Sequence, residues 1–132
     1  MKDLTDALWA RAKDALRTAG HDLPVSPDAA VSRAYYAAFY AVSAMFSLRG
    51  RTFRKHSAVE AAVHRDLVKA GLWPEELGEG YSALVALRHT GDYGDLDRVS
   101  SGEAHRAVAL ATEILRAVAK SDPDAFGGLG EA

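Results

Sequence analysis

The fold is decided by residues 31–47, which read VSRAYYAAFYAVSAMFS. Alanine is the best helix former, and the apolar residues here recur every three or four positions rather than every second one. Because successive residues lie about 100° apart around a helix, one side collects an apolar stripe. That stripe consists of Val31, Tyr35, Ala38, Phe39, Val42, Met45 and Phe46. The stretch therefore predicts a helix that buries one side in a core.

The opposite side of this helix is more polar. It carries Arg33, Tyr36, Ala37, Tyr40, Ser43 and Ser47. An arginine one turn away from two tyrosines is unusual on a packed helix, and two compatible interpretations remain open. Either the side is solvated and its tyrosines pack on a neighbouring helix, or it forms a cleft or dimer face. In the second case Arg33 binds an anion and the tyrosines donate hydrogen bonds.

Glycines, prolines and serines divide the rest of the chain into further helices. Ser57 and Ser100 each precede a glutamate at capping-box spacing, and Pro27 follows Ser26 as a typical first helical residue. The expected helices span about residues 3–19, 27–49, 56–71, 74–91 and 100–120. Short loops favour antiparallel neighbours, so the predicted fold is all-α, an antiparallel bundle of about five helices.

This bundle is expected to occupy residues 1–120 as one domain. Residues 121–132 are rich in Gly and Asp, and we expect them to form a flexible tail. The absence of cysteine excludes disulfides and thiolate chemistry. His56 and His64 lack aligned carboxylates, so neither a metal site nor another cofactor is expected. The first residues do not read as a signal peptide and no stretch is apolar enough to span a membrane, which predicts a soluble, cytoplasmic protein.

The charge balance bears on nucleic-acid binding. The formal net charge is −2 at pH 7, whereas a non-specific nucleic-acid binder usually has a strong basic bias. Any contact with RNA or a nucleotide must therefore come from a local cluster of cations. One such cluster, with no acid between its members, is Arg49, Arg51, Arg54, Lys55 and His56.

A second candidate is the segment at residues 88–93, which reads RHTGDY. Arg88 falls on the apolar side of its predicted helix, and a buried arginine needs a partner because an unpaired buried charge is costly. Asp92 lies four residues on and is one possible partner. The alternative is that Arg88 binds a phosphate, to which its planar fork donates two parallel hydrogen bonds.

Three segments together carry a resemblance. They are residues 32–41 (SRAYYAAFYA), residues 54–57 (RKHS) and residues 88–93 (RHTGDY). The first resembles the signature helix of the HEPN domain family, in its small stand-alone prokaryotic branch. The second is similar to the basic-His step of that branch into its third helix, and the third to its Arg-x-x-Ala-Asp-Tyr motif. The segments come in the family's order, and the resemblance covers about residues 3–120.

The resemblance implies a bundle of about five helices, often a homodimer, with a role in nucleotide or RNA binding. Many members of the family pair with a small nucleotidyltransferase in toxin–antitoxin or defence modules. Some are metal-independent ribonucleases that use an Arg-x(4–6)-His motif near the fourth helix. Here Tyr93 occupies the position of that histidine, and a tyrosine with a pKa near 10 is a poor base at neutral pH. The motif's spacing does occur from Arg51 and from Arg49 to His56, between two helices.

Three hypotheses follow. The first is a dimeric binding module in which Arg33, Tyr36 and Arg88 line a site for nucleotide or RNA. Its remaining ligand-binding candidates are Tyr40, His56 and Asp92. The second is a ribonuclease toxin that uses Arg88 with Tyr93 or His56. The third is a structural adaptor without ligand, whose polar face is the dimer interface.

Overall fold

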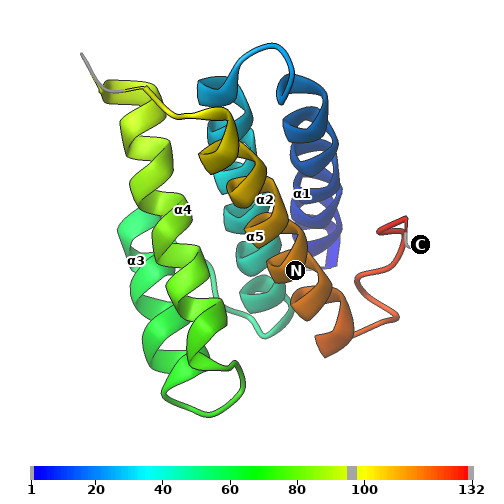
Figure 1. Cartoon of the computed structure of the whole chain (residues 1–132). Coiled ribbons are helices and arrows are strands. Elements are labelled where there is room, and N and C mark those ends of the chain that lie inside the picture. The colour runs from blue at the N-terminus through cyan, green and yellow to red at the C-terminus, as the bar shows by residue number, and fades with distance from the viewer. Residues whose placement is uncertain (1, 95–97, 131–132) are drawn as a thin grey trace.

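The computed structural model describes residues 2–94 and 98–130 and confirms the all-α prediction. Its helices are α1 (Lys2–Asp22), α2 (Pro27–Leu48), α3 (His56–Ala62), the π-helix η1 (Val63–Val68), α4 (Glu75–Tyr93) and α5 (Ser101–Ser121). In Figure 1, α1 and α2 run side by side and antiparallel, and α3 and α4 form a second antiparallel pair. The last helix, α5, crosses between the two pairs.

The central element of the bundle is α2. It packs against α1, α4 and α5, so both sides of this helix are covered. All residues of the predicted apolar stripe are buried except Phe39, which is half-buried. On the opposite side Ala37 and Ser47 are buried under α1, where the Ser47 hydroxyl is hydrogen-bonded to Thr5 at 2.8 Å. Part of the polar side therefore belongs to a helix interface.

Small residues explain the close pairing of α1 with α2. Buried alanines line both partners, and a methyl group lets two helix backbones approach closely. They are Ala12, Ala15 and Ala19 on α1, and Ala30, Ala34, Ala37, Ala41 and Ala44 on α2. The larger side chains that fill the core, such as Phe46, Leu84 and Leu115, come from α2, α4 and α5.

Two of the predicted caps are present. The Ala29 amide donates to the Ser26 hydroxyl at 3.2 Å, and Ser100 forms a reciprocal capping box with Glu103. The expected capping box of Ser57 and Glu60 is wrong, because α3 begins at His56 and Ser57 therefore lies inside the helix. The N-cap residue is Lys55, and its side chain makes no cap hydrogen bond. The Glu60 carboxylate instead accepts a hydrogen bond from Ser82 of α4 at 2.7 Å. The π-helical turn that follows α3 was not predicted from the sequence.

The segment after α5 departs from the expectation of a flexible tail over residues 122–130. Phe126 is only 1% exposed and packs on Trp9 of α1, with ring centroids 5.2 Å apart. The indole N–H of Trp9 donates to the Gly127 carbonyl at 2.8 Å. A single aromatic residue thus anchors a segment whose glycines and aspartates predicted no fixed structure.

Candidate functional site

The predicted site residues meet where the end of α4 lies against the first half of α2. The Arg88 guanidinium donates to the Tyr36 hydroxyl at 3.3 Å and to the Asp92 carboxylate at 3.2 Å. Both open interpretations of Arg88 therefore have a basis, because Asp92 pairs with it while the group remains partly exposed. The side chain of Arg88 is 20% exposed and that of Asp92 28%.

Two arginines share one aromatic ring at this place. The guanidinium carbon of Arg33 lies 5.1 Å from the centre of the Tyr36 ring, and that of Arg88 lies 5.4 Å from it. Arg88 also lies 5.1 Å from the Tyr35 ring and 5.8 Å from the Tyr93 ring. The structure thus brings Arg33, Tyr36 and Arg88 together within one subunit. Both cations are held by aromatic faces, which leaves donor groups available to an anion.

His56 joins this group from the first turn of α3. Its Nδ1 is hydrogen-bonded to the Tyr35 hydroxyl at 2.8 Å, and its ring stacks on Phe39 with centroids 4.0 Å apart. The Tyr36 ring lies edge-on at 5.7 Å. The loop after α2 therefore folds back toward the end of α4. We call the group of Arg33, Tyr35, Tyr36, Phe39, His56, Arg88 and Asp92 the Arg88 cluster.

The pKa shifts in the Arg88 cluster keep the His56 imidazole and the Tyr35 hydroxyl uncharged beside the arginines. Burial lowers the pKa of His56, and the positive charge of Arg88 lowers it further. The imidazole is therefore mostly uncharged at neutral pH. Burial raises the pKa of Tyr35 to about 12, so its hydroxyl keeps its proton. Burial also raises the pKa of Tyr81, which lies beside Tyr35 in the core.

Tyr40 lies at the edge of the Arg88 cluster. Its ring centre is 5.8 Å from that of Tyr36, and the Arg11 guanidinium of α1 lies 5.9 Å from the same ring centre of Tyr40. Arg11, Arg33 and Tyr40 line a shallow hollow of about 370 Å³. Arg11 was not predicted, because nothing along the chain relates the middle of α1 to the signature helix. Tyr93 is 60% exposed and extends the aromatic surface beyond Arg88.

The basic segment at residues 49–56 does not act as one cluster. Arg51 pairs with Asp66 at 2.7 Å and lies over the rings of Phe46 and Phe53. Arg49 lines a cavity that contains no residue of the Arg88 cluster. Within the described chain His56 is hydrogen-bonded to Tyr35 and not to either arginine. The spacing of Arg51 and Arg49 to His56 therefore does not correspond to a paired site.

Other kinds of site find less support. No three His, Asp or Glu side chains come close enough to hold a metal ion within residues 2–94 and 98–130. None of the helices in the described parts of the chain is both long and apolar enough to cross a membrane. What the Arg88 cluster offers is two guanidinium groups, the half-buried rings of Tyr36 and Phe39, and a neutral imidazole, with the exposed ring of Tyr93 beside them.

The fold and the Arg88 cluster together define an all-α helix bundle with a group of arginines and tyrosines at the contact of α2 with α4. Comparison with known proteins gives the family. The model of the HEPN domain matches residues 5–121, so the chain belongs to the HEPN domain family. It is 42% identical over 91 residues to a UPF0332 protein of Thermotoga maritima, a match that covers 69% of either chain. The fold is similar to the crystal structure of TT1696 from Thermus thermophilus, with a TM-score of 0.75 and 25% identity over 88% of this chain and 96% of that one.

Membership of this family confirms the resemblance deduced from the three sequence segments. It supports a nucleotide- or RNA-related role at the level of the family.

Proposed function

We propose that the Arg88 cluster binds the phosphate and base of a nucleotide or of RNA, so that the chain is a HEPN-type binding module. The observation that carries this proposal is the shared contact of Arg33 and Arg88 with Tyr36. Among the described residues, Asp92 is the one carboxylate hydrogen-bonded to either arginine. The cluster therefore has more positive than negative charge, although the whole chain has a net charge of −2.

The roles of the side chains follow from their chemistry. Arg88 is oriented by Asp92 and Tyr36, which fixes its planar fork, and such a fork suits the bidentate binding of a phosphate. Arg33 makes no ion pair with a described residue, so its guanidinium is available to the same anion. The exposed ring of Tyr93 provides a face on which a base can stack.

The test is direct binding of a labelled single-stranded RNA and of AMP, followed by fluorescence anisotropy at two salt concentrations. We expect Arg88→Gln and Arg33→Gln each to weaken binding about tenfold or more, since each removes a charged donor to phosphate. The control is Arg106→Gln, which removes an exposed charge of α5 outside the Arg88 cluster. Equal binding by the wild type and by both cluster variants would refute the proposal.

The partner part of the proposal rests on the family. We propose that the chain is a homodimer that works with a small nucleotidyltransferase in a toxin–antitoxin or defence module. The test is expression alone and with any neighbouring gene, with growth, RNA integrity and co-purification as readouts. This part is contradicted if growth and RNA integrity are unaffected in both cases and no protein co-purifies. The proposed binding site would still be judged by the binding assay above.

A second candidate function is RNA cleavage, favoured by the position of His56. Tyr35 occupies its Nδ1, so Nε2 is the nitrogen left to meet a substrate. When Nδ1 carries the proton, Nε2 can accept the proton of an RNA 2′-hydroxyl. The 2′-oxygen then bonds to phosphorus as the bond from phosphorus to the 5′-oxygen breaks, and water protonates the leaving oxygen. Arg88 would stabilise the charge that develops on the phosphate.

A further inference from the structure

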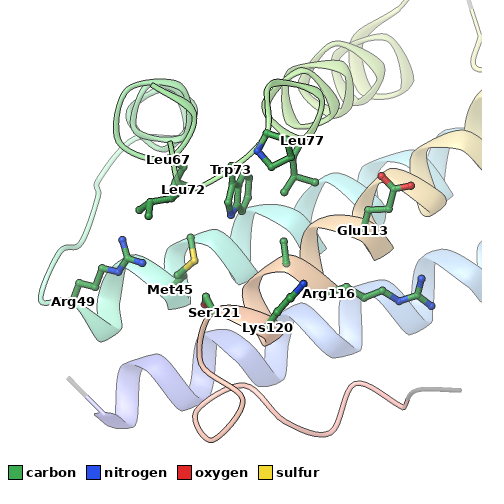
Figure 2. Close-up of a pocket in the computed structure, with 12 residues that line it drawn as sticks. Met45, Arg49, Leu67, Leu72, Trp73, Leu77, Glu113, Arg116, Lys120 and Ser121 are labelled. Atoms are coloured by element: carbon green, nitrogen blue, oxygen red, sulfur yellow. The ribbon is translucent and has the colours of Figure 1, made fainter. Parts of the chain in front are cut away.

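A second concavity lies where α2 and α5 end and α4 begins, at the other end of the bundle from the Arg88 cluster (Figure 2). Its volume is about 650 Å³, within the range of roughly 300–1,000 Å³ that is typical of small-molecule sites. None of its lining residues belongs to the Arg88 cluster. It therefore needs an explanation of its own.

The inner wall of this cavity is apolar. Met45 of α2 and Leu67 of η1 are buried in it, and Leu77 of α4 lines its upper side in Figure 2. Leu72 lies at its edge and is 58% exposed, which makes it one of the few large apolar side chains left in water. Covering this surface with an apolar group would be favourable, because apolar area is removed from water.

Trp73 provides an unpaired donor inside the cavity. The side chain is 8% exposed, and its indole N–H has no acceptor among the described residues. Figure 2 shows the nitrogen edge of the ring turned toward the space between α2 and α5. In contrast, the indole N–H of the other tryptophan, Trp9, donates to the Gly127 carbonyl. Among the described residues Tyr81 has the buried side-chain polar atom that lacks a partner, so the Trp73 N–H is still reached by solvent. It is therefore available to an acceptor atom supplied by a ligand in the cavity.

The rim of the cavity is cationic. Arg49, Arg116 and Lys120 line it, and none of them forms an ion pair within the described parts of the chain. Glu113 is the one acidic residue in the lining. Several other arginines, such as Arg51 and Arg98, do pair with an aspartate. The rim is thus complementary to a negative charge placed above an apolar floor.

We propose that this cavity binds an amphipathic organic anion. Its apolar body covers Met45 and Leu72, its acceptor atom takes the Trp73 N–H, and its anionic head lies among Arg49, Arg116 and Lys120. This site is independent of the nucleotide site proposed above, because the two share no residue.

The probe for the test is anilinonaphthalene sulfonate, which combines apolar rings with one anionic group. The two indole N–H resonances in an NMR spectrum of the labelled protein report its position. We expect the Trp73 resonance to shift on titration while that of Trp9 stays in place, since Trp9 is already bonded to the chain. Trp73→Phe assigns the signal and should weaken binding. Shifts of both signals, or of neither, would overturn the proposal.

Charge is tested separately with variants that leave the core intact. Arg116→Gln/Lys120→Gln should weaken binding of the probe about fivefold or more at low salt, because two nearby charges are lost. The control Arg17→Gln/Arg106→Gln removes two exposed charges elsewhere and should change it little. Dodecanoate should displace the probe and dodecanol should not. Displacement by both alcohol and acid, or equal binding by the two double variants, would show that no anion is recognised.

Discussion

Single residues decide the chemistry of the Arg88 cluster. Arg88 donates hydrogen bonds to Asp92 and Tyr36, which orient its guanidinium group. The side chain is still partly exposed, so the same group can also bind an anion from solution. His56 is set against Phe39 and Tyr35, so its ring is fixed although it comes from another helix. These contacts give each side chain a defined orientation, which a binding site for a small anion requires.

The first prediction concerns the titration of His56. NMR should report a pKa below the ordinary value of 6.5, and Arg88→Gln should raise it in part. This substitution reverses only part of the pKa shift, because burial of His56, which is the larger cause, remains. As the folded-state pKa is depressed, the unfolded chain binds the proton more readily. The free energy of unfolding therefore has its full value above pH 6.5, where His56 is neutral in both states. It decreases as the pH falls from 6.5 toward the folded-state pKa, because the unfolded chain then binds a proton that the folded protein does not. An unshifted pKa in the wild type would contradict this account.

The second prediction is that the purified protein alone is a weak or inactive ribonuclease. Tyr93 stands where a catalytic histidine is expected, and a phenol is a poor base at neutral pH. The assay is single-turnover cleavage of a mixed-sequence RNA in chelator, comparing Arg88→Ala, Tyr93→Phe and His56→Ala with the wild type. Robust cleavage that is lost in both Arg88→Ala and His56→Ala would reverse this ranking and make RNA cleavage the primary function.

At the scale of elements, α2 is the helix on which the others assemble. The predicted stripe is buried, but the opposite side is also covered where α1 packs on it. Phe39 is the exception within the stripe, since it lies half-buried beneath His56. A face that the sequence assigned to the core thus contributes two residues, Tyr35 and Phe39, to the candidate site.

The third prediction separates these two kinds of position on α2. Phe46→Ala should lower the free energy of unfolding by about 3–5 kcal/mol, as expected for a fully buried ring. Phe39→Ala should cost less, because part of that ring is already in contact with solvent. Urea unfolding measures both. A larger loss for Phe39 than for Phe46 would mean that the assigned burial of the two rings is wrong.

The fourth prediction tests the contact of η1 with α4. A Cβ atom at Gly78 would lie 2.6 Å from Val68 and 3.3 Å from His64, so Gly78→Ala should destabilise the fold by about 1–3 kcal/mol. Gly20 of α1 is the matched control, since a Cβ there meets nothing within 4 Å. Gly20→Ala should stabilise by up to about 1 kcal/mol through helix propensity. Thermal unfolding that ranks the two variants the other way would argue against the tight η1–α4 contact.

At the scale of the whole molecule, the bundle separates two surfaces. The Arg88 cluster lies at the first half of α2, and the cationic cavity lies at the end of that helix. Members of the HEPN domain family are often dimeric, and the exposed Tyr93 and half-buried Tyr36 leave aromatic surface uncovered at the first of these places.

The fifth prediction is therefore assembly as a homodimer. Light scattering at micromolar concentration should report twice the chain mass of 14.1 kDa. A monomer at this concentration would refute the prediction.

The helices and their alanine-rich contacts were predictable because they depend on local properties: helix propensity, apolar spacing and capping residues such as Ser26 and Ser100. Arg33, Tyr36 and Arg88 were predictable as a group because Arg33 and Tyr36 share one helix side and the family resemblance added Arg88. What the tertiary structure alone decided are contacts between distant segments. The loop after α2 directs Arg51 to Asp66 and brings His56 to Tyr35.

The same division holds for the rest of the chain. Its sequence determined an all-α bundle of the HEPN family, since each helix is encoded within its own residues. It did not determine the anchoring of Phe126 on Trp9, the π-helical turn or the unpaired indole of Trp73. Each of these depends on how neighbouring helices fill space around a side chain, and that is a property of packing that no local pattern of residues records.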